Sequence, residues 1–374
     1  MIYRQINPAY LDKLDDGQRE YIKTGSGWFF AYEFLFVPAE HGYVIGPTGS
    51  GKTNKMVNLC AWLKHTEVIL WISASKDQDI TPLFFMGKPV NIIIPKYSDI
   101  KITLDGGEIP NVVYSRVSKP QDIFYAIKTD HINILEVRNA FWDRGKLLDF
   151  MIEFFRLIAE WTRTGIMPRF RPDVKSSGKS KITVFIDESQ WLIAGSKVTN
   201  DPYRTKATAI ISESALEIRT YGWRLIIASQ GFTNVPPIIR ENMACTFLCS
   251  GADIKDPPKL RLQCFPNIPG YTPSSRFKKS QYKFLNRNGD SIPVRGPVPV
   301  PLYPKDEKDR EMAERIRITY GKTFHDLHSD AEEIQFAPCF FNLGSLSDIT
   351  VEEKPTEDKG YNLYYLPEEV TPNE

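Results

Sequence analysis

The chain has 374 residues, of which 42% are hydrophobic and 12% aromatic, and its 47 lysines and arginines offset 46 acidic residues to leave a formal charge of +1. This globular composition excludes disordered, collagen-like and disulfide-scaffold proteins, and at about 150 residues per domain it predicts two domains or one large α/β domain with additions. The balanced charge argues against a uniformly basic nucleic-acid coat protein but is compatible with a basic patch on one face.

The N-terminal leader, residues 1–40, is rich in aromatic residues. Acidic side chains stand where a secretory signal needs an apolar core, and the most apolar stretch, residues 28–37, is too short to span a membrane. Every second residue of this stretch is aromatic, which predicts a β-strand packed on the core. These residues are Trp28, Phe30, Tyr32, Phe34 and Phe36. They could instead line an adenine or a partner, and we assign them no function.

From Gly42 onward the sequence alternates between strand-like and helix-like segments, and we expect a nucleotide-binding α/β core at residues 41–251. An apolar strand at 43–45 leads through a glycine-rich turn into a helix at 52–64, and a second strand follows at 67–73. A strand, a helix and a strand in this order form a βαβ unit, which predicts parallel pairing in a central sheet.

The complete GxxxxGK[ST] pattern of a phosphate-binding loop stands between the first strand and the helix. It comprises Gly46, Pro47, Thr48, Gly49, Ser50, Gly51, Lys52 and Thr53. Its glycines let backbone N–H groups and the helix N-terminus point at the β-phosphate, while Lys52 can reach the β- and γ-phosphates and the Thr53 hydroxyl can bind Mg²⁺. We therefore predict that these eight residues bind a nucleoside triphosphate.

A long insertion at about residues 74–180 separates this unit from the next motif. It contains strand-like segments at 91–94 and 112–117 and an amphipathic helix at 141–163. The loop after this helix is basic, and clustered cations can neutralise nucleic-acid phosphates. This first candidate DNA-binding patch comprises Arg169, Arg171, Lys175, Lys179 and Lys181. Solvated surface charges would look the same, so both interpretations stay open.

The strongest strand pattern in the chain, residues 182–186, ends in Asp187 and Glu188. A parallel strand delivers its C-terminal residues to the same sheet edge as the phosphate loop, so Asp187 can hold Mg²⁺ while Glu188 polarises the attacking water. A glutamate directly after the aspartate favours an ATPase that carries its own general base over a kinase or a GTPase switch.

A third motif combines a helix at 203–221, which ends at Gly222, with a strand at 225–229 that leads to Gln230. Gln230 can bond the γ-phosphate or the attacking water. Arg219, in the last turn of the helix, is expected near the opposite sheet edge and cannot reach its own nucleotide. It either acts in trans as an arginine finger or interacts with the helix dipole.

Beyond a strand at 245–249, we expect a C-terminal extension, residues 252–374, with clustered prolines and a hairpin at Asn288-Gly289. The last 23 residues carry seven acids and two bases, 2 − 7 = −5, which is typical of a mobile or partner-binding tail. A second candidate DNA-binding patch lies in this extension. It comprises Arg276, Lys278, Lys279 and Lys283, with Phe277 and Tyr282 interleaved.

Together these motifs resemble the FtsK/HerA superfamily of P-loop ATPases, over roughly residues 40–250. The discriminating feature is the Asp-Glu pair followed by the pattern R-x-x-G-x-x-L-I-x-A-[ST]-Q. The phosphate-loop, acid, finger and sensor positions of that family are matched by Lys52, Thr53, Asp187, Glu188, Arg219 and Gln230. Residues 235–242 also look like the family segment after the sensor strand. The chain departs from the family in the insertion at 74–181 and in the absence of a recognisable winged-helix domain or membrane anchor.

The resemblance implies a RecA-like (ASCE) P-loop fold, with a mainly parallel sheet flanked by helices, and a homo-oligomeric ring, a hexamer in the family. It implies an ATP-hydrolysing, Mg²⁺-dependent motor that translocates DNA. We expect double-stranded DNA as the partner, although the sequence itself does not distinguish it from single-stranded DNA. A compact chain without an anchor suits viral genome packaging, with a capsid or portal protein as a further partner. A plasmid-transfer pump and an assembly or export ATPase that acts on protein, as in filamentous phages, are the alternatives. A nucleotide-dependent scaffold with little turnover is a third possibility, which Glu188 argues against.

The cysteine pattern bears on the location of the protein. The cysteines are odd in number and lack a CxxC pair, which argues against a disulfide framework and a zinc knuckle. They are Cys60, Cys245, Cys249, Cys264 and Cys339. We expect a reducing, cytoplasmic location without an integral membrane segment, in the host cytoplasm or associated with the virion if the protein is viral.

Overall fold

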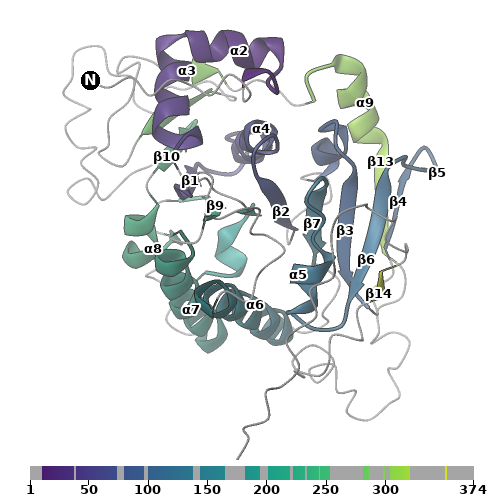
Figure 1. Cartoon of the computed structure of the whole chain (residues 1–374), viewed down its shortest axis with the longest axis vertical. Coiled ribbons are helices and arrows are strands. Elements are labelled where there is room, and N and C mark those ends of the chain that lie inside the picture. Colours follow the sequence, from purple (N-terminus) through teal and green to yellow (C-terminus); the bar gives the residue numbers. More distant parts are fainter. Residues whose placement is uncertain are drawn as a thin grey trace, which may run out of the picture.

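A computed structural model of the chain describes residues 11–37, 39–73, 80–96, 100–137, 144–164, 182–193, 201–219, 222–231, 234–243, 245–252, 281–285, 298–299, 304–320 and 350–351. Most of these residues form one large twisted sheet with helices on both faces (Figure 1). No helix in this part of the chain combines the length and the apolar character that crossing a bilayer requires.

The central sheet has the strand order β12-β11-β10-β1-β9-β8-β2-β7-β3-β6-β14. From β10 to β6 all neighbours are parallel, while β11, β12 and β14 pair antiparallel at the two ends. The strands are β1 (Gly42–Ile45), β2 (Val68–Ser73), β3 (Val90–Pro95), β6 (Val112–Val117), β7 (Ile132–Glu136), β8 (Ile182–Ile186), β9 (Trp223–Ser229), β10 (Cys245–Cys249), β11 (Gln281–Leu285), β12 (Val298–Pro299) and β14 (Thr350–Val351). The predicted parallel sheet is therefore confirmed.

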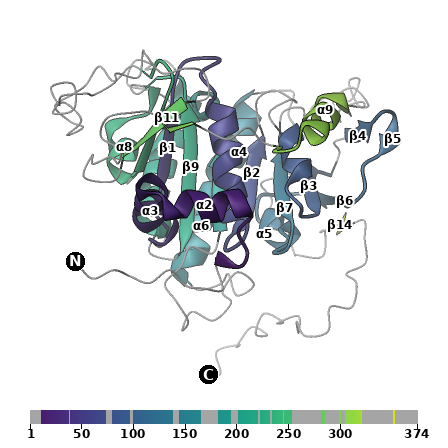
Figure 2. The same cartoon turned by 90° about the horizontal axis from the view of Figure 1, so that it is seen from above.

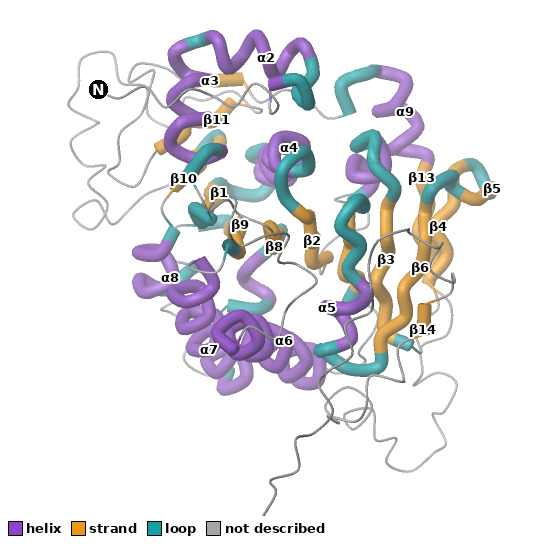
Figure 3. The backbone as a smooth tube through the Cα atoms, viewed as in Figure 1, coloured by secondary structure: helices purple, strands orange, loops and turns teal. Residues whose placement is uncertain are grey.

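Helices cover both faces of this sheet, as Figures 1 and 3 show. One layer contains α2 (Asp16–Lys23), α3 (Gly25–Phe30) and α4 (Lys52–Leu63). The other contains α5 (Asp122–Ala126), α6 (Arg144–Thr164), α7 (Pro202–Ile218) and α8 (Pro237–Asn242). Seen from above in Figure 2, α2 lies over α4, and Gln18 Nε2 of α2 donates to the Ala61 carbonyl of α4 at 3.3 Å.

Two apolar cores fill the space between the sheet and its helices. Side chains alternate across each strand, so in β8 Val184 belongs to the core under α6 and α7, whereas Phe185 belongs to the core under α3 and α4. Because both faces are buried, the central strands are almost continuously apolar, which is why the sequence pattern identified most of them.

The leader is helical, and the predicted strand at residues 28–37 is wrong. Residues 25–30 form α3 and residues 31–35 form a π-helical turn, with the Gly27 N–H bonded to the Thr24 side-chain hydroxyl at 3.0 Å as a cap. An aromatic residue at every second position also places aromatic pairs four residues apart, the spacing of neighbours on a helix. Trp28 stacks on Tyr32 and Phe30 on Phe34, with ring centroids 5.0 and 5.6 Å apart.

The insertion extends the central sheet. Its strands β3, β6 and β7 line up beyond β2, and β7 was not recognised in the sequence. A small second sheet has the order β13-β4-β5, formed by β13 (Ile316–Tyr320), β4 (Ile100–Leu104) and β5 (Gly107–Glu108). The helix α9 (Glu307–Arg315) leads into β13 and contacts a short 3₁₀ helix at Thr81–Phe85. Residues 304–320 thus pack against the insertion, far from them in sequence.

The C-terminal region also contributes to the central sheet. The predicted strand at 281–285 is present as β11 and pairs antiparallel with β10. The predicted turn at Asn288-Gly289, the strand after it and the acidic tail lie outside the described residues.

Candidate active site

The predicted phosphate loop joins the end of β1 to the start of α4. Gly51 has a φ of 92° and Gly49 a φ of 78°, which are left-handed backbone conformations that residues other than glycine rarely adopt. A Cβ atom on Gly46 would lie 2.4 Å from Ser50 Oγ and 2.9 Å from Cys249 Cβ, so a larger residue does not fit there. The three glycines therefore allow the loop to curl around the helix N-terminus.

The loop has the features of a polyphosphate site. The first-turn N–H groups of α4 point out of the helix, and the space beside Gly49 is open, with no atom within 4 Å of a Cβ position. Ser50 Oγ is buried without a hydrogen-bond partner among the described residues. Lys52 Nζ donates to the Pro47 carbonyl at 2.9 Å, so its ammonium group lies at the loop. Phosphate oxygens suit such a set of donors.

The acidic and sensor residues lie at the same sheet edge as the phosphate loop. β9 lies between β1 and β8, all three strands are parallel, and Ile45 is in register with Ser229. The carboxyl ends of β1, β9 and β8 lead respectively into the phosphate loop, Gln230 and Asp187. Such an edge of a parallel sheet is where ligands bind in α/β proteins.

Thr53 and Asp187 are the residues that would hold Mg²⁺. Thr53 lies in the first turn of α4, and Asp187 follows β8 with 5% of its surface exposed. In phosphate sites Mg²⁺ is bound by few protein groups and completes its shell with substrate phosphates and water. In the described part of the chain, no group of three His, Cys, Asp or Glu residues could hold a metal alone. One hydroxyl and one carboxylate therefore fit an ion that binds together with the nucleotide.

Glu188 is held between two amides. Its Oε1 accepts a hydrogen bond from Gln230 Nε2 at 3.0 Å and another from Gln190 Nε2 at 2.5 Å. The structure thus brings together Glu188 and Gln230, which the sequence separates by 42 residues. Gln190 was not identified from the sequence, where a glutamine two positions after the acidic pair carries no signal of its own.

A buried hydroxyl pair fixes the backbone around Gln230. The Tyr43 hydroxyl lies 2.6 Å from Ser229 Oγ, and both hydroxyls donate to the Gly231 carbonyl, at 3.0 and 2.7 Å. Burial raises the pKa of Tyr43 well above its usual value, so the phenol keeps its proton. The strand of the phosphate loop is thereby tied to both neighbours of Gln230.

Arg219 lies away from this edge, as expected. It caps the C-terminus of α7, and its Nη2 forms an ion pair with Glu40 Oε1 at 2.5 Å. Glu40 precedes β1, at the edge of the sheet opposite to the phosphate loop. Within one chain the structure therefore does not bring Arg219 to Lys52 or Glu188.

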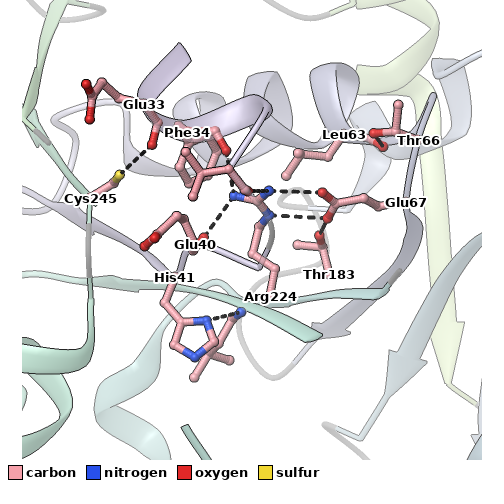
Figure 4. Close-up of polar contacts among 12 residues, drawn as sticks. Glu33, Phe34, Glu40, His41, Leu63, Thr66, Glu67, Thr183, Arg224 and Cys245 are labelled. Carbon is pink, nitrogen blue, oxygen red and sulfur yellow. Dashed lines mark hydrogen bonds and ion pairs between the residues drawn. The ribbon is translucent and has the colours of Figure 1, made fainter. Parts of the chain in front are cut away.

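Behind Glu40 lies a buried arginine that the sequence did not single out (Figure 4). Arg224 in β9 is fully buried, and it forms an ion pair with Glu67 at 3.0 Å. Its guanidinium also donates to the carbonyls of Phe34, Val37 and Glu40 at 3.1, 3.2 and 2.9 Å. Figure 4 shows the side chain between the backbone of the leader and Glu67, so Arg224 helps to join the leader to the sheet.

The two candidate DNA-binding patches fall mostly outside the described residues, which include none of residues 165–181 or 253–280. The expectation for Tyr282 is wrong, because its side chain is 3% exposed and packs in the core against Phe247. Tyr282 alternates with residues on the other face of β11, and its own face is turned to α3 and α4.

No protein-family model matches the chain, and no curated protein does. Among solved structures it is similar to the genome packaging NTPase B204 from Sulfolobus turreted icosahedral virus 2, with 13% identity and a TM-score of 0.40 over 70% of this chain and 98% of that one. It is also similar to EssC (ATPases 2 and 3) from Geobacillus thermodenitrificans, with 12% identity and a TM-score of 0.40 over 79% and 45% of the two chains. The conjugation coupling protein TcpA of pCW3 matches with 17% identity and a TM-score of 0.36 over 75% and 65%.

These neighbours are P-loop ATPases of the kind that the sequence motifs resemble. The fold follows from the chain itself: a phosphate loop after β1, an acidic pair after β8, and β9 between these two strands in a parallel sheet. The chain has the RecA-like P-loop ATPase fold.

Proposed function

We propose that the protein is a Mg²⁺-dependent ATPase that works as a ring motor and translocates double-stranded DNA, in the packaging of a viral genome. The observation that carries the ATPase part is the position of Glu188 beside Gln230, at the edge where the phosphate loop also lies. A nucleotide-binding scaffold has no need of a carboxylate held at this place.

In the proposed reaction the residues divide binding and chemistry between them. The loop N–H groups and Lys52 bind the β- and γ-phosphates, and Thr53 and Asp187 hold Mg²⁺, which would neutralise phosphate charge when bound. Glu188 accepts a proton from a water that attacks the γ-phosphorus in line. The bond from this phosphorus to the β–γ bridging oxygen breaks, and ADP and phosphate are released. Gln230 donates to Glu188 and can also bond the γ-phosphate or the water.

Arg219 is proposed to complete the site of a neighbouring copy. Its side chain is 36% exposed at the opposite sheet edge, so it is available at the surface that a ring would present to the next subunit. Its ion pair joins a partly exposed guanidinium to the buried carboxylate of Glu40, so a neighbour's phosphate has to compete with Glu40 for the arginine. An arginine supplied in trans typically accelerates phosphoryl transfer by about 10³–10⁵-fold.

The DNA-translocating role rests on the resemblance of the motifs to the FtsK/HerA superfamily. Within that superfamily a plasmid-transfer pump and an assembly or export ATPase acting on protein are the rival roles. The first test is ATP hydrolysis by the purified chain with and without linear double-stranded DNA at two salt concentrations. Several-fold stimulation that weakens as salt rises supports a DNA motor, because phosphate contacts are salt-dependent. Turnover that is indifferent to DNA favours the protein-assembly role.

The trans role of Arg219 has its own test. Arg219→Ala and Lys52→Ala are each expected to abolish turnover, and mixing the two variants should restore part of it. In mixed rings, an intact phosphate loop from one variant faces an intact arginine from the other. If mixing restores nothing while both variants still assemble, Arg219 does not act in trans.

A further inference from the structure

The carboxylate of Glu188 accepts hydrogen bonds from residues on two different elements. Gln230 Nε2, beyond the end of β9, and Gln190 Nε2, in the 3₁₀ turn Ser189–Trp191 after β8, both donate to Oε1, at 3.0 and 2.5 Å. No described residue donates to the other oxygen, Oε2. The described residues thus hold one of the two carboxylate oxygens, Oε1.

Both donors stand on rigid backbone. The turn that carries Gln190 is closed by hydrogen bonds from the Leu192 and Ile193 N–H groups to the Ser189 carbonyl, at 3.0 and 2.7 Å. Leu192 and Ile193 are fully buried in the core under α6 and α7, so the turn cannot shift without opening that core. Gln230 is held through its neighbours by the Tyr43 hydroxyl.

Among the described residues, the side-chain amide of Gln190 forms a hydrogen bond with Glu188 and with no other residue. Its Oε1 is buried and accepts no hydrogen bond from any described residue, so the bond to Glu188 is the one described contact that orients the amide. A side chain that only stabilised the turn would be expected to bond the backbone of the turn itself.

We propose that Gln190 is a positioning residue for Glu188: with Gln230 it locks the carboxylate so that Oε2 faces the attacking water. The proposal rests on the ATPase function proposed above. A general base must lie within about 2.6–3.2 Å of the proton it removes, and an error of about 1 Å in placement can cost roughly 10²-fold in rate. When the Gln190 amide is removed, the Glu188 carboxylate keeps only the hydrogen bond from Gln230. It can then turn away from the position in which Oε2 faces the water.

The test uses the full chain with Gln190→Ala and Gln190→Leu, and Ser189→Ala as a matched control. The control residue lies in the same turn, and its buried Oγ has no described partner, so its loss removes no bond. Steady-state kcat and KM for ATP are measured together with the affinity for a non-hydrolysable ATP analogue. We expect kcat to fall about 10-fold in both Gln190 variants, with KM and analogue affinity within about twofold of wild type. Ser189→Ala should leave all three within about twofold.

Three results would overturn the proposal. An unchanged or raised kcat in the Gln190 variants would mean that the amide does not place Glu188 for reaction. A parallel loss of analogue affinity would show a structural role in the site as a whole. If the wild type binds ATP but never hydrolyses it, the proposed ATPase function fails and this inference fails with it. If the wild type hydrolyses ATP, Glu188→Gln abolishes that turnover and the Gln190 variants keep wild-type kcat, only the inference about Gln190 is contradicted.

Discussion

Among single residues, Lys52 and Glu188 are expected to act at different stages of the reaction. Lys52 contacts phosphates in the bound nucleotide, whereas Glu188 contributes only when water attacks, so their substitutions should separate binding from turnover. We predict that Glu188→Gln binds ATP with near wild-type affinity but hydrolyses it about 10²–10⁴-fold more slowly. Lys52→Ala should lose affinity as well. Nucleotide titration measures the affinity for ATP, and phosphate release measures the hydrolysis rate. A wild-type hydrolysis rate in Glu188→Gln would exclude Glu188 as the general base.

A second residue of interest is Lys55, one turn after Lys52 in α4. It is fully buried, and its Nζ lies 3.5, 4.8 and 5.4 Å from the ring centroids of Tyr282, Phe247 and Phe30. Burial lowers the pKa of Lys55 from 10.5 to about 7, although cation–π contacts favour the charged form.

The sign of the resulting pH dependence follows from linkage. Between about pH 7 and 10.5 the unfolded chain binds a proton on Lys55 that the folded chain does not, so stability rises with pH over this range. The cost of burying the lysine is greatest below pH 7 and disappears above 10.5. We predict that Lys55→Met is more stable than wild type at pH 7 and that this difference shrinks by pH 9.5. Denaturant unfolding of both proteins at the two pH values tests this, and a constant difference would contradict it.

At the scale of elements, the phosphate loop depends on the close approach of β1, α4 and β10. Gly46→Ala would place a methyl group against Ser50 and Cys249, so the loop must move off the helix N-terminus. We predict a loss of ATP affinity of about 10-fold or more, since a displacement of about 1 Å is enough for such an effect. Gly25→Ala, in the first turn of α3 with no atom within 4 Å, is the matched control and should bind ATP normally. Equal affinities in the two variants would contradict the packing argument.

The leader shows why element type was harder to predict than element position. Alternating aromatic residues satisfy the period of a strand, yet the pairs Trp28 with Tyr32 and Phe30 with Phe34 also satisfy the four-residue spacing of a helix. Whether the segment forms a strand or a helix depends on the side chains against which its aromatic rings pack. Here Phe30 and Phe34 pack against Phe247 and Phe284, which arrive from β10 and β11 more than 200 residues later.

At the scale of the whole molecule, Arg224 links regions that are far apart in the chain. Removing one partner of a buried ion pair leaves the other charge buried alone, which typically costs about 3–5 kcal/mol. We predict that Arg224→Met and Glu67→Met are each destabilised by about this amount, and that the double variant recovers part of the loss because neither charge remains. Denaturant unfolding of the three variants provides the measurement. Additive losses in the double variant would show that the two side chains are not coupled.

Most central strands, the phosphate loop, the Asp187-Glu188 pair after β8 and the place of Arg219 relative to the phosphate loop were within reach of the sequence, whereas β7 and the small sheet β13-β4-β5 were not. The signals of the predicted features are local: an apolar run for a strand buried on both faces, a glycine spacing for the loop, and the rule that parallel strands end at one edge. The tertiary structure decided three other features. These are the hydrogen bonds from Gln190 and Gln230 to Glu188, the Tyr43 hydroxyl that links β1 to the end of β9, and the buried Arg224. Each depends on which strands become neighbours and on where distant segments meet, and local periodicity carries no record of those contacts.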